Sequence, residues 1–316
     1  MSVFLAKRLA TMVATLLFSS LVVFLVLEIL PGDPAQVLLG VDGTPEQLAV
    51  LREKMGLNAP AAARYFSWIG NMLTGDFGTS YAYGVPVWSL LEERLALTVP
   101  LALVAMAMTA LFGLVLGVWA AARHNRPGDL AIMGISQLGI SIPNFWFALM
   151  LILLFAVKLG WFSAGGFPGW EDGVGEGLKA LLLPALALAT VQAAILARIT
   201  RSSVIDVLQE DFVRTARAKG LGRRAVLWRH ALRNALIPVI TVMGLQFAEL
   251  LVGAIVVEQV FTLPGMGRLV FQSIANRDLQ VVKGIVILLA FMVVAVNFAV
   301  DLLYALIDPR LKASDV

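Results

Sequence analysis

VPLALVAMAMTALFGLVLGVWAAA, the stretch Val99–Ala122, decides the fold class of this chain. It holds no charged side chain, and about 20 apolar residues in a helix cross the hydrocarbon core of a bilayer. Five further stretches are also long enough and mostly apolar: Leu9–Leu30, Ala131–Val157, Leu178–Ala197, Ala235–Val257 and Val281–Ile307. The apolar runs are continuous rather than alternating, which favours helices over a transmembrane barrel. The sequence therefore predicts an all-α polytopic membrane protein with six transmembrane helices.

The composition of the whole chain agrees with a membrane protein. Of the 316 residues, 59% are apolar and 14% are charged. The charged share is about half that of an ordinary globular domain. This composition excludes a disordered chain, a soluble enzyme with one buried core and a disulfide-stapled secreted domain. There is no cysteine and there are 2 histidines, His124 and His230, so we expect neither a thiolate site nor a multi-histidine metal site.

Basic residues between the spans predict the orientation, because Lys and Arg accumulate in cytoplasmic loops. Most of the 24 basic residues lie in the N-terminal segment, the second and fourth connections and the C-terminal tail. We therefore expect both termini and residues 198–234 in the cytoplasm. Residues 31–98 are expected on the outer side, with short amphipathic helices at Gln47–Met55 and Arg64–Leu73. The chain is interpreted as one transmembrane domain, 1–316.

The cytoplasmic loop 198–234 has a helical pattern. Four of its apolar residues are spaced as one face of a helix: Ile205, Leu208, Phe212 and Ala216. Gly220 and Gly222 predict the end of this helix, since glycine readily adopts the left-handed C-terminal conformation. A second helical segment is expected from Arg223 to Ile237, with Pro238 at the beginning of the fifth span.

Three roles fit two basic helices at the cytoplasmic surface. Attraction to anionic lipid requires only the charges. Basic runs also occur in nucleic-acid-binding proteins, but this segment lacks base-stacking aromatic residues and is tethered to a membrane bundle, so nucleic acid is not expected as a partner. A docking element that receives force from a soluble partner also explains the apolar face and the glycine break.

Short motifs along the chain carry a resemblance to a known family. Residues Arg214–Gly220 read RTARAKG, where Gly220 fits the glycine of an EAA-like signature and Arg214 replaces the general glutamate. Further motifs follow the same order as in the family: Leu30–Pro34, Gly75–Ser80, Ala235–Pro238, Val256–Glu258, Pro264–Gly267 and Asp308–Arg310. On these residues the chain resembles the dipeptide/oligopeptide/nickel permease family of type I ABC importers, and within it the first-permease type.

The resemblance implies a division of labour in the bacterial cytoplasmic (inner) membrane. The implied partners are a homologous second permease, two cytoplasmic ABC ATPases and an extracytoplasmic substrate-binding protein. ATP and Mg²⁺ would bind to the ATPase subunits, so this chain is expected to be a translocation subunit without a cofactor and not an enzyme. The sequence agrees on one point, because it contains no G-x-x-x-x-G-K-[ST] motif that would hold ATP phosphates.

The resemblance also implies a coupling helix, which we expect at Asp211–Gly220 within the loop 198–234, entering a groove on an ATPase. We expect Phe212 and Ala216 to form its apolar anchor, and Arg214, Arg217 and Lys219 to meet acidic groups at the rim. The full set of expected ATPase-coupling residues is Asp211, Phe212, Arg214, Thr215, Ala216, Arg217, Ala218, Lys219 and Gly220.

Polar residues within the spans are candidates for a solute path: Glu249, Gln246 and Asn144. Glu249 lies near the middle of the fifth span and either lines the path or bonds to a neighbouring helix or permease. Gln246 precedes it by one turn and would share its face. Asn144 follows Pro143 at a possible kink near the beginning of the third span.

Other residues within the spans are expected to pack helices together. Gly113 and Gly117 form a G-x-x-x-G pattern, which permits two helices to approach closely. Three polar residues are interpreted in the same way: Gln137, Gln192 and Asn297.

The resemblance favours a short peptide or peptide-like solute. Nickel or another small solute is the alternative, although Asp33 and Asp76 would make a poor nickel site because nickel prefers imidazole ligands. A stand-alone secondary transporter would need paired membrane carboxylates or inverted repeats, and Glu249 is the one central carboxylate. An intramembrane enzyme would need paired catalytic carboxylates, a nucleophile with its base or a metal cluster, and no such set occurs in the spans.

Overall fold

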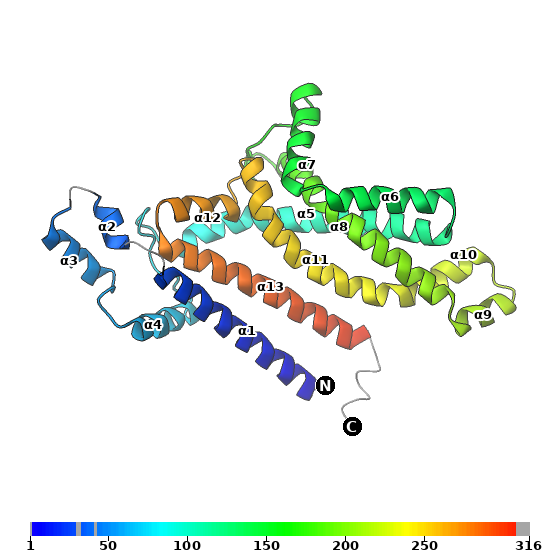
Figure 1. Cartoon of the computed structure of the whole chain (residues 1–316), viewed down its shortest axis with the longest axis horizontal. Helices are drawn as coiled ribbons and strands as arrows, with labels where there is room; N and C mark the ends of the chain where they lie inside the picture. Colours follow the sequence, from blue (N-terminus) through cyan, green and yellow to red (C-terminus); the bar gives the residue numbers. More distant parts are fainter. Residues whose placement is uncertain (1, 30–32, 41–42, 308–316) are drawn as a thin grey trace. The chain divides into compact units, whose positions relative to one another are not determined.

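The computed structural model describes residues 2–29, 33–40 and 43–307. The regular secondary structure of these residues is helical (Figure 1). No strand occurs in these residues, so the predicted all-α fold class is confirmed. Parts of two sequence motifs, residues 30–32 and 308–310, lie outside the described residues.

Five helices of the described chain are long and apolar enough to cross a membrane. They are α1 (Ser2–Ile29), α5 (Val87–Ala122), α8 (Val174–Leu208), α11 (Leu232–Val260) and α13 (Leu279–Ile307). They correspond to five of the six predicted spans. Helix α8 ends later than predicted, so residues 198–208 are helical and the loop is shorter than 198–234.

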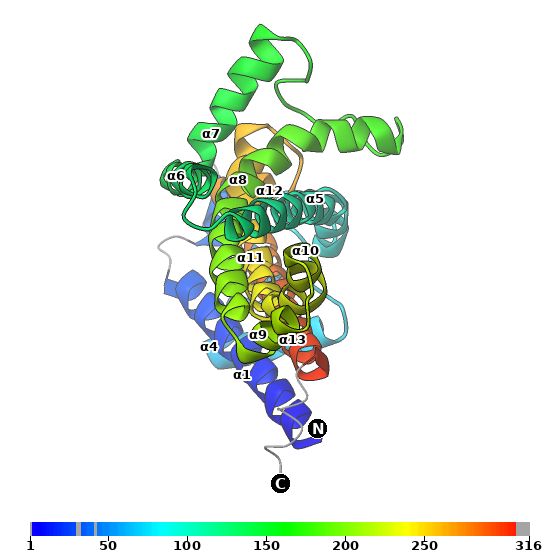
Figure 2. The same ribbon diagram turned by 90° about the vertical axis from the view of Figure 1, so that its right-hand side faces the viewer.

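The third predicted span, Ala131–Val157, is broken in the middle. Helix α6 (Pro127–Ser141) is followed by α7 (Asn144–Leu151) and the π-helical turn η1 (Ile152–Lys158), and the two parts meet at 102°. Figure 2 shows α7 rising steeply from the end of α6. The break follows from Pro143, because a residue before proline disfavours the helical conformation, and Ile142 is extended at φ −89° and ψ 124°. The predicted kink is therefore real but lies inside the span rather than at its beginning.

Shorter helices connect the spans: α2 (Pro34–Leu39), α3 (Pro45–Lys54), α4 (Ala61–Leu73), α9 (Asp211–Ala218), α10 (Arg223–Ala225), η2 (Val226–Ala231) and α12 (Met266–Ala275). Helices α3 and α4 confirm that the two segments predicted as helices, Gln47–Met55 and Arg64–Leu73, are helical. Helix α3 begins with a capping box, in which Thr44 Oγ1 accepts from the Gln47 backbone N–H at 3.3 Å and Gln47 Oε1 accepts from the Thr44 N–H at 3.0 Å.

The chain divides into two compact units. Unit 1 contains residues 98–263 and the chain from 295 on, together with the first residues of α1. Unit 2 contains residues 7–97 and 264–294. Its core joins α5, α12 and α13 through Leu91, Met266 and Ile285, all wholly buried. A second apolar cluster joins α1, α4 and α13 through Phe24, Trp68 and Ile287.

Helix α8 is the centre of unit 1, where it packs against α6, α7 and α11. Two glycines of α5 lie directly against it. A Cβ atom at Gly113 would stand 2.7 Å from Leu196 Cβ, and one at Gly117 would stand 2.6 Å from the Ala197 carbonyl oxygen. Real Cβ atoms do not approach so closely, so only glycine permits this contact. The predicted close approach at the G-x-x-x-G pattern is confirmed.

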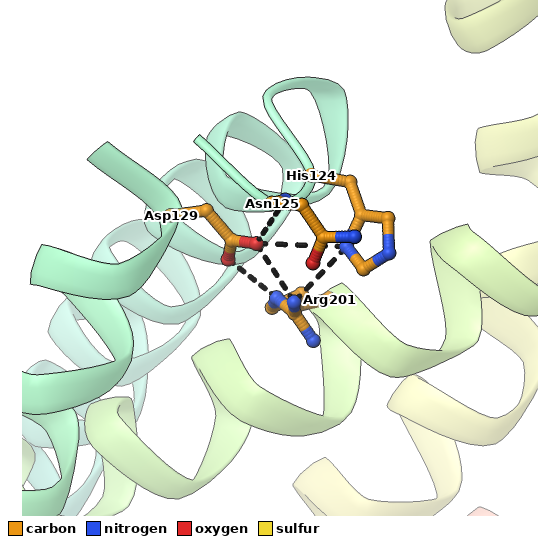
Figure 3. Close-up of polar contacts among 4 residues, drawn as sticks. All are labelled: His124, Asn125, Asp129 and Arg201. Atoms are coloured by element: carbon orange, nitrogen blue, oxygen red, sulfur yellow. Dashed lines mark hydrogen bonds and ion pairs between the residues drawn. The ribbon is translucent and has the colours of Figure 1, made fainter. Parts of the chain in front are cut away.

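A buried ion pair joins the beginning of α6 to α8 (Figure 3). The Asp129 carboxylate is wholly buried and accepts from Arg201 Nε at 2.5 Å and from Arg201 Nη2 at 2.7 Å. It also accepts from the backbone N–H of Asn125 at 2.9 Å. Asn125 has φ 61°, a left-handed conformation that asparagine tolerates, so the pair also fixes the turn between α5 and α6. Arg201 Nη2 lies 3.1 Å from His124 Nδ1. The sequence placed Arg201 in a cytoplasmic loop and gave no sign of its partner.

The Gly117 contact predicts a stability difference between two glycine-to-alanine variants. Gly117→Ala forces apart α5 and α8 and should cost about 1–3 kcal/mol of unfolding free energy. Gly134→Ala is the matched control, since a Cβ there meets no atom within 4 Å and alanine favours a helix. Thermal unfolding of the two purified variants in detergent checks this. Equal melting temperatures would contradict the close contact.

The Asp129–Arg201 pair predicts strong coupling between its two residues. Arg201→Met leaves the buried Asp129 carboxylate without its main counter-charge and should cost about 3–5 kcal/mol. Asp129→Asn added to Arg201→Met removes the stranded charge, so the double variant should be more stable than Arg201→Met alone. The melting temperatures of the wild type, both single variants and the double variant measure the coupling. Additive effects would mean that the two residues do not act as a pair.

Candidate functional site

Helix α9, the expected coupling helix, follows α8 after a sharp turn at Gln209 and Glu210. Glu210 is extended at ψ 150°, so the two helices are separate. The prediction of one continuous apolar face through Ile205, Leu208, Phe212 and Ala216 is therefore wrong. The buried face of α9 consists instead of Val213 and Ala216, which pack on Val226 of η2 and on Leu208.

The two residues expected to anchor α9 on a partner have different surroundings. Phe212 is 42% exposed, whereas Ala216 is 6% exposed and lies in the apolar cluster with Val226. Ala216 therefore holds α9 against its own chain, which corrects its expected role as an anchor for a partner. Phe212 is the one large apolar side chain on the solvent-exposed face of α9.

The remaining expected coupling residues, in α9 and directly after it, are exposed: Asp211, Arg214, Thr215, Arg217, Ala218, Lys219 and Gly220. Asp211 Oδ1 pairs with Arg214 Nη1 at 3.3 Å on the surface, a weak contact that a partner can displace. The outer face of α9 thus combines cationic side chains with one aromatic ring. This arrangement suits a partner surface that has an apolar hollow and an acidic rim.

Gly220 ends α9 as the sequence predicts. Its φ is 82°, its N–H donates to the Arg217 carbonyl at 2.9 Å, and the Leu221 N–H donates to the Ala216 carbonyl at 3.3 Å. These two bonds form a Schellman motif, which requires a left-handed residue at this position. Gly222 has an ordinary φ of −65° and precedes the next helix.

The second predicted helical segment is confirmed and continues further than expected. Helical structure runs from Arg223 through η2 into α11 without a break, up to Val260, and Pro238 lies inside α11 rather than at its beginning. Figure 1 shows α9 and α10 as a hairpin between the ends of α8 and α11. Because α9 packs on η2 and η2 continues into α11, η2 links α9 to α11.

Two of the candidate path residues lie together, and a third residue joins them. Gln192 of α8 donates from Nε2 to Glu249 Oε2 at 2.9 Å, and Gln246 donates from Nε2 to the Gln192 backbone carbonyl at 2.8 Å. Gln192 and Gln246 are buried, while Glu249 is exposed. Gln192 thus packs helices together as predicted, and Glu249 bonds to a neighbouring helix while keeping an open side.

Asn144 extends this polar group along α11. Its Nδ2 lies 3.9 Å from the Cβ position of Gly253, one turn after Glu249. The side-chain oxygens of Asn144, Gln192 and Gln246 are buried and accept no hydrogen bond from the described residues. Both glutamine Nε2 atoms face acceptors, which fixes the orientation of the two amides. The helix interface therefore contains three amide oxygens that can still accept hydrogen bonds. Leaving a buried acceptor unsatisfied costs free energy.

Comparisons with known proteins place nearly the whole chain in one family. Residues 1–102 match the N-terminal domain of the binding-protein-dependent transport system membrane component, and residues 113–313 match the binding-protein-dependent transport system inner membrane component. Two solved structures have a related fold at 18% identity. These are the inward-facing MetNI methionine ABC transporter, with TM-score 0.58 over 70% of this chain and 97% of that chain, and an amino acid ABC transporter crystallised with histidines, with TM-score 0.54 over 68% and 93%.

Curated relatives are similar over almost their full length. A putative peptide transport system permease protein of Brucella abortus is 41% identical, covering 99% of both chains. The dipeptide transport system permease protein DppB of Alkalihalophilus pseudofirmus is 39% identical over 97% of this chain and 98% of its own. The glutathione transport system permease protein GsiC of Salmonella choleraesuis is 40% identical over 97% of each. The predicted resemblance is confirmed, and the chain belongs to the family of binding-protein-dependent transport system inner membrane components, the multi-pass permease subunits of ABC transporters.

Proposed function

We propose that this chain is the permease subunit of an ABC importer that carries short peptides or peptide-like solutes across the bacterial inner membrane. The observation that carries the proposal is full-length similarity, near 40% identity, to permeases named for peptide, dipeptide and glutathione transport. These names favour peptides over nickel. The chain would work with a second permease, two cytoplasmic ATPases and an extracytoplasmic binding protein, with both its termini in the cytoplasm. ATP and Mg²⁺ would bind to the ATPases.

Helix α9 is the proposed contact with an ATPase. Phe212 would fill an apolar hollow, while Arg214, Arg217 and Lys219 would meet acidic groups around it. Movement of the ATPase would push α9, and the buried contact of Val213 with Val226 would pass the movement to η2 and α11. Alternating access would follow from the rigid-body movement of helices rather than from a continuous pore.

Glu249, Gln246 and Asn144 are the proposed path residues. Glu249 and Gln246 belong to α11, the helix that α9 would move, and Asn144 of α7 lies beside α11. The exposed carboxylate of Glu249 would accept hydrogen bonds from the N–H groups of a passing peptide. Ionisable residues inside membrane spans usually face such a cavity or a partner.

The coupling role predicts different effects at two neighbouring glycines. Gly220→Val places a β-branched residue at φ 82° and should distort the end of α9, so ATP-driven peptide uptake should fall at least severalfold while insertion and abundance stay normal. Gly222→Val is the control, because its φ is ordinary and a Cβ there meets nothing within 4 Å. Uptake into proteoliposomes and the ATPase rate should be measured together. Full uptake with Gly220→Val would sink the coupling role of α9.

The path role of Glu249 predicts that a variant can lose peptide uptake without losing thermal stability. Glu249→Gln keeps an oxygen that accepts from Gln192 and removes only the charge, so the melting temperature should stay near that of the wild type. Peptide uptake should nevertheless fall severalfold if the carboxylate meets the solute. Glu249→Leu also removes the hydrogen bond to Gln192 and should lower both values. Normal uptake with Glu249→Gln would leave Glu249 as a helix-packing residue.

A further inference from the structure

Unit 2 contains a cavity that neither α9 nor the polar group on α11 touches. Its volume is about 700 Å³, within the range of roughly 300–1,000 Å³ that is usual for small-molecule sites. It lies among the end of α1, the turn before α2, helix α4, the loop before α5 and the beginning of α13. Four aromatic residues line it together with its polar groups: Phe24, Trp68, Phe77 and Tyr81.

Six charged residues line the cavity, and their formal charges sum to zero: Arg52, Arg64, Lys283, Glu28, Asp33 and Asp76. Four of them form two ion pairs. Arg52 Nη2 lies 2.6 Å from Asp33 Oδ2, and Arg64 pairs with Glu28. A cavity with a net charge near zero favours a neutral or zwitterionic ligand over an ion of either sign.

One cation and one anion remain without an ion pair among the residues that the structure describes. Lys283 has its Nζ over the Trp68 ring, 5.6 Å from the centroid, and is partly buried at the beginning of α13. Asp76 accepts from the Gly78 backbone N–H at 2.8 Å and has no basic partner. A ligand with a carboxylate at one end and an ammonium group at the other would complement both.

Two further groups around the cavity lack a hydrogen-bond partner within the described chain. Arg64 Nε is a buried donor and Gln280 Oε1 is a buried acceptor, so one of each remains to be satisfied. A peptide group offers one carbonyl and one N–H. The Tyr81 hydroxyl adds a neutral donor, because burial, and then the nearby Asp278, raise the pKa of Tyr81 to about 12.

We propose that this cavity is a binding site for a short peptide with free termini. Lys283 would receive the C-terminal carboxylate, Asp76 the N-terminal ammonium group, and Arg64 Nε and Gln280 Oε1 the peptide group between them. The proposal rests on the proposed peptide transport and places a recognition step within unit 2, apart from Glu249. A zwitterionic phospholipid headgroup shares this chemistry, and the experiment separates the two sources.

The experiment uses the complete transporter, with its second permease and ATPases, in lipid nanodiscs without the binding protein. Tritiated alanyl-phenylalanine is the probe, and scintillation proximity measures its binding. The wild type should bind it saturably, and Lys283→Gln and Asp76→Asn should each weaken binding about tenfold or more, the usual worth of a charge-assisted contact. Lys54→Gln, an exposed lysine of the same unit outside the cavity, should bind as the wild type does.

Blocked peptides test the two ends without relying on the folding of a variant. The N-acetylated dipeptide should bind the wild type weakly and should not respond to Asp76→Asn. The C-terminal amide should likewise bind weakly and should not respond to Lys283→Gln. Blocked and free dipeptides that bind equally well would overturn the proposal.

ATP-driven uptake with the binding protein present separates this site from the function on which it rests. The wild type could take up the dipeptide while binding does not depend on Lys283 or Asp76. That result would overturn the proposed binding site and leave the proposed peptide transport intact. A phospholipid that native mass spectrometry finds on the wild type but not on Lys283→Gln, without peptide binding, would overturn the peptide in favour of a headgroup. Failure of both uptake and binding would overturn both proposals.

Discussion

The close approach of helix backbones around α8 is the constraint on which unit 1 depends. Inside a bilayer, apolar side chains gain little from leaving lipid, so helices associate through close packing and a few polar contacts. At Gly117 the absence of a side chain lets α5 lie against the Ala197 carbonyl, and buried alanines of α8 permit similar contacts on its other sides. This geometry brings the polar side chains of α8 within hydrogen-bonding distance of α6 and α11.

The polar contacts of α8 give its two halves different roles. Gln192 bonds to Glu249 and accepts from Gln246, while Arg201, further along α8, holds the buried Asp129 carboxylate. The ion pair ties α6 to the part of α8 that leads into α9. Burying a carboxylate and a guanidinium costs desolvation that a bidentate contact offsets only in good geometry, so such a pair fixes one arrangement of the helices more than it adds stability. A rigid end of α8 gives α9 a firm base, and α11 is the other helix to which the hairpin connects.

Continuous apolar runs made the helices predictable. The end of α9 at Gly220 was also predictable, because the rule for a glycine at a helix C-terminus needs only neighbouring residues. Tertiary partners were not predictable in the same way. Spacing alone put Ile205 and Phe212 on one helix face, but the turn at Gln209 and Glu210 separates them, and Val213 packs instead. The break at Pro143 showed in the sequence as a possible kink, while its angle of 102° depends on packing. Arg201 looked like an ordinary cytoplasmic arginine, because its partner lies 72 residues away.

The charged groups of this chain differ in how completely their hydrogen bonds and ion pairs are satisfied. This difference distinguishes the structural sites from the functional candidates. Asp129 uses both carboxylate oxygens and is wholly buried, as expected for a contact that holds helices together. Among the described residues, Glu249 has one hydrogen bond and an open side, and Lys283 lies over an aromatic ring without an ion pair. A charge in or near a membrane span is costly unless something compensates it. Glu28 lines the same cavity as Lys283 and offsets its charge in part. Water, a partner chain or a solute can complete the compensation at Glu249 and at Lys283, so each is a place where a polar solute group would be recognised.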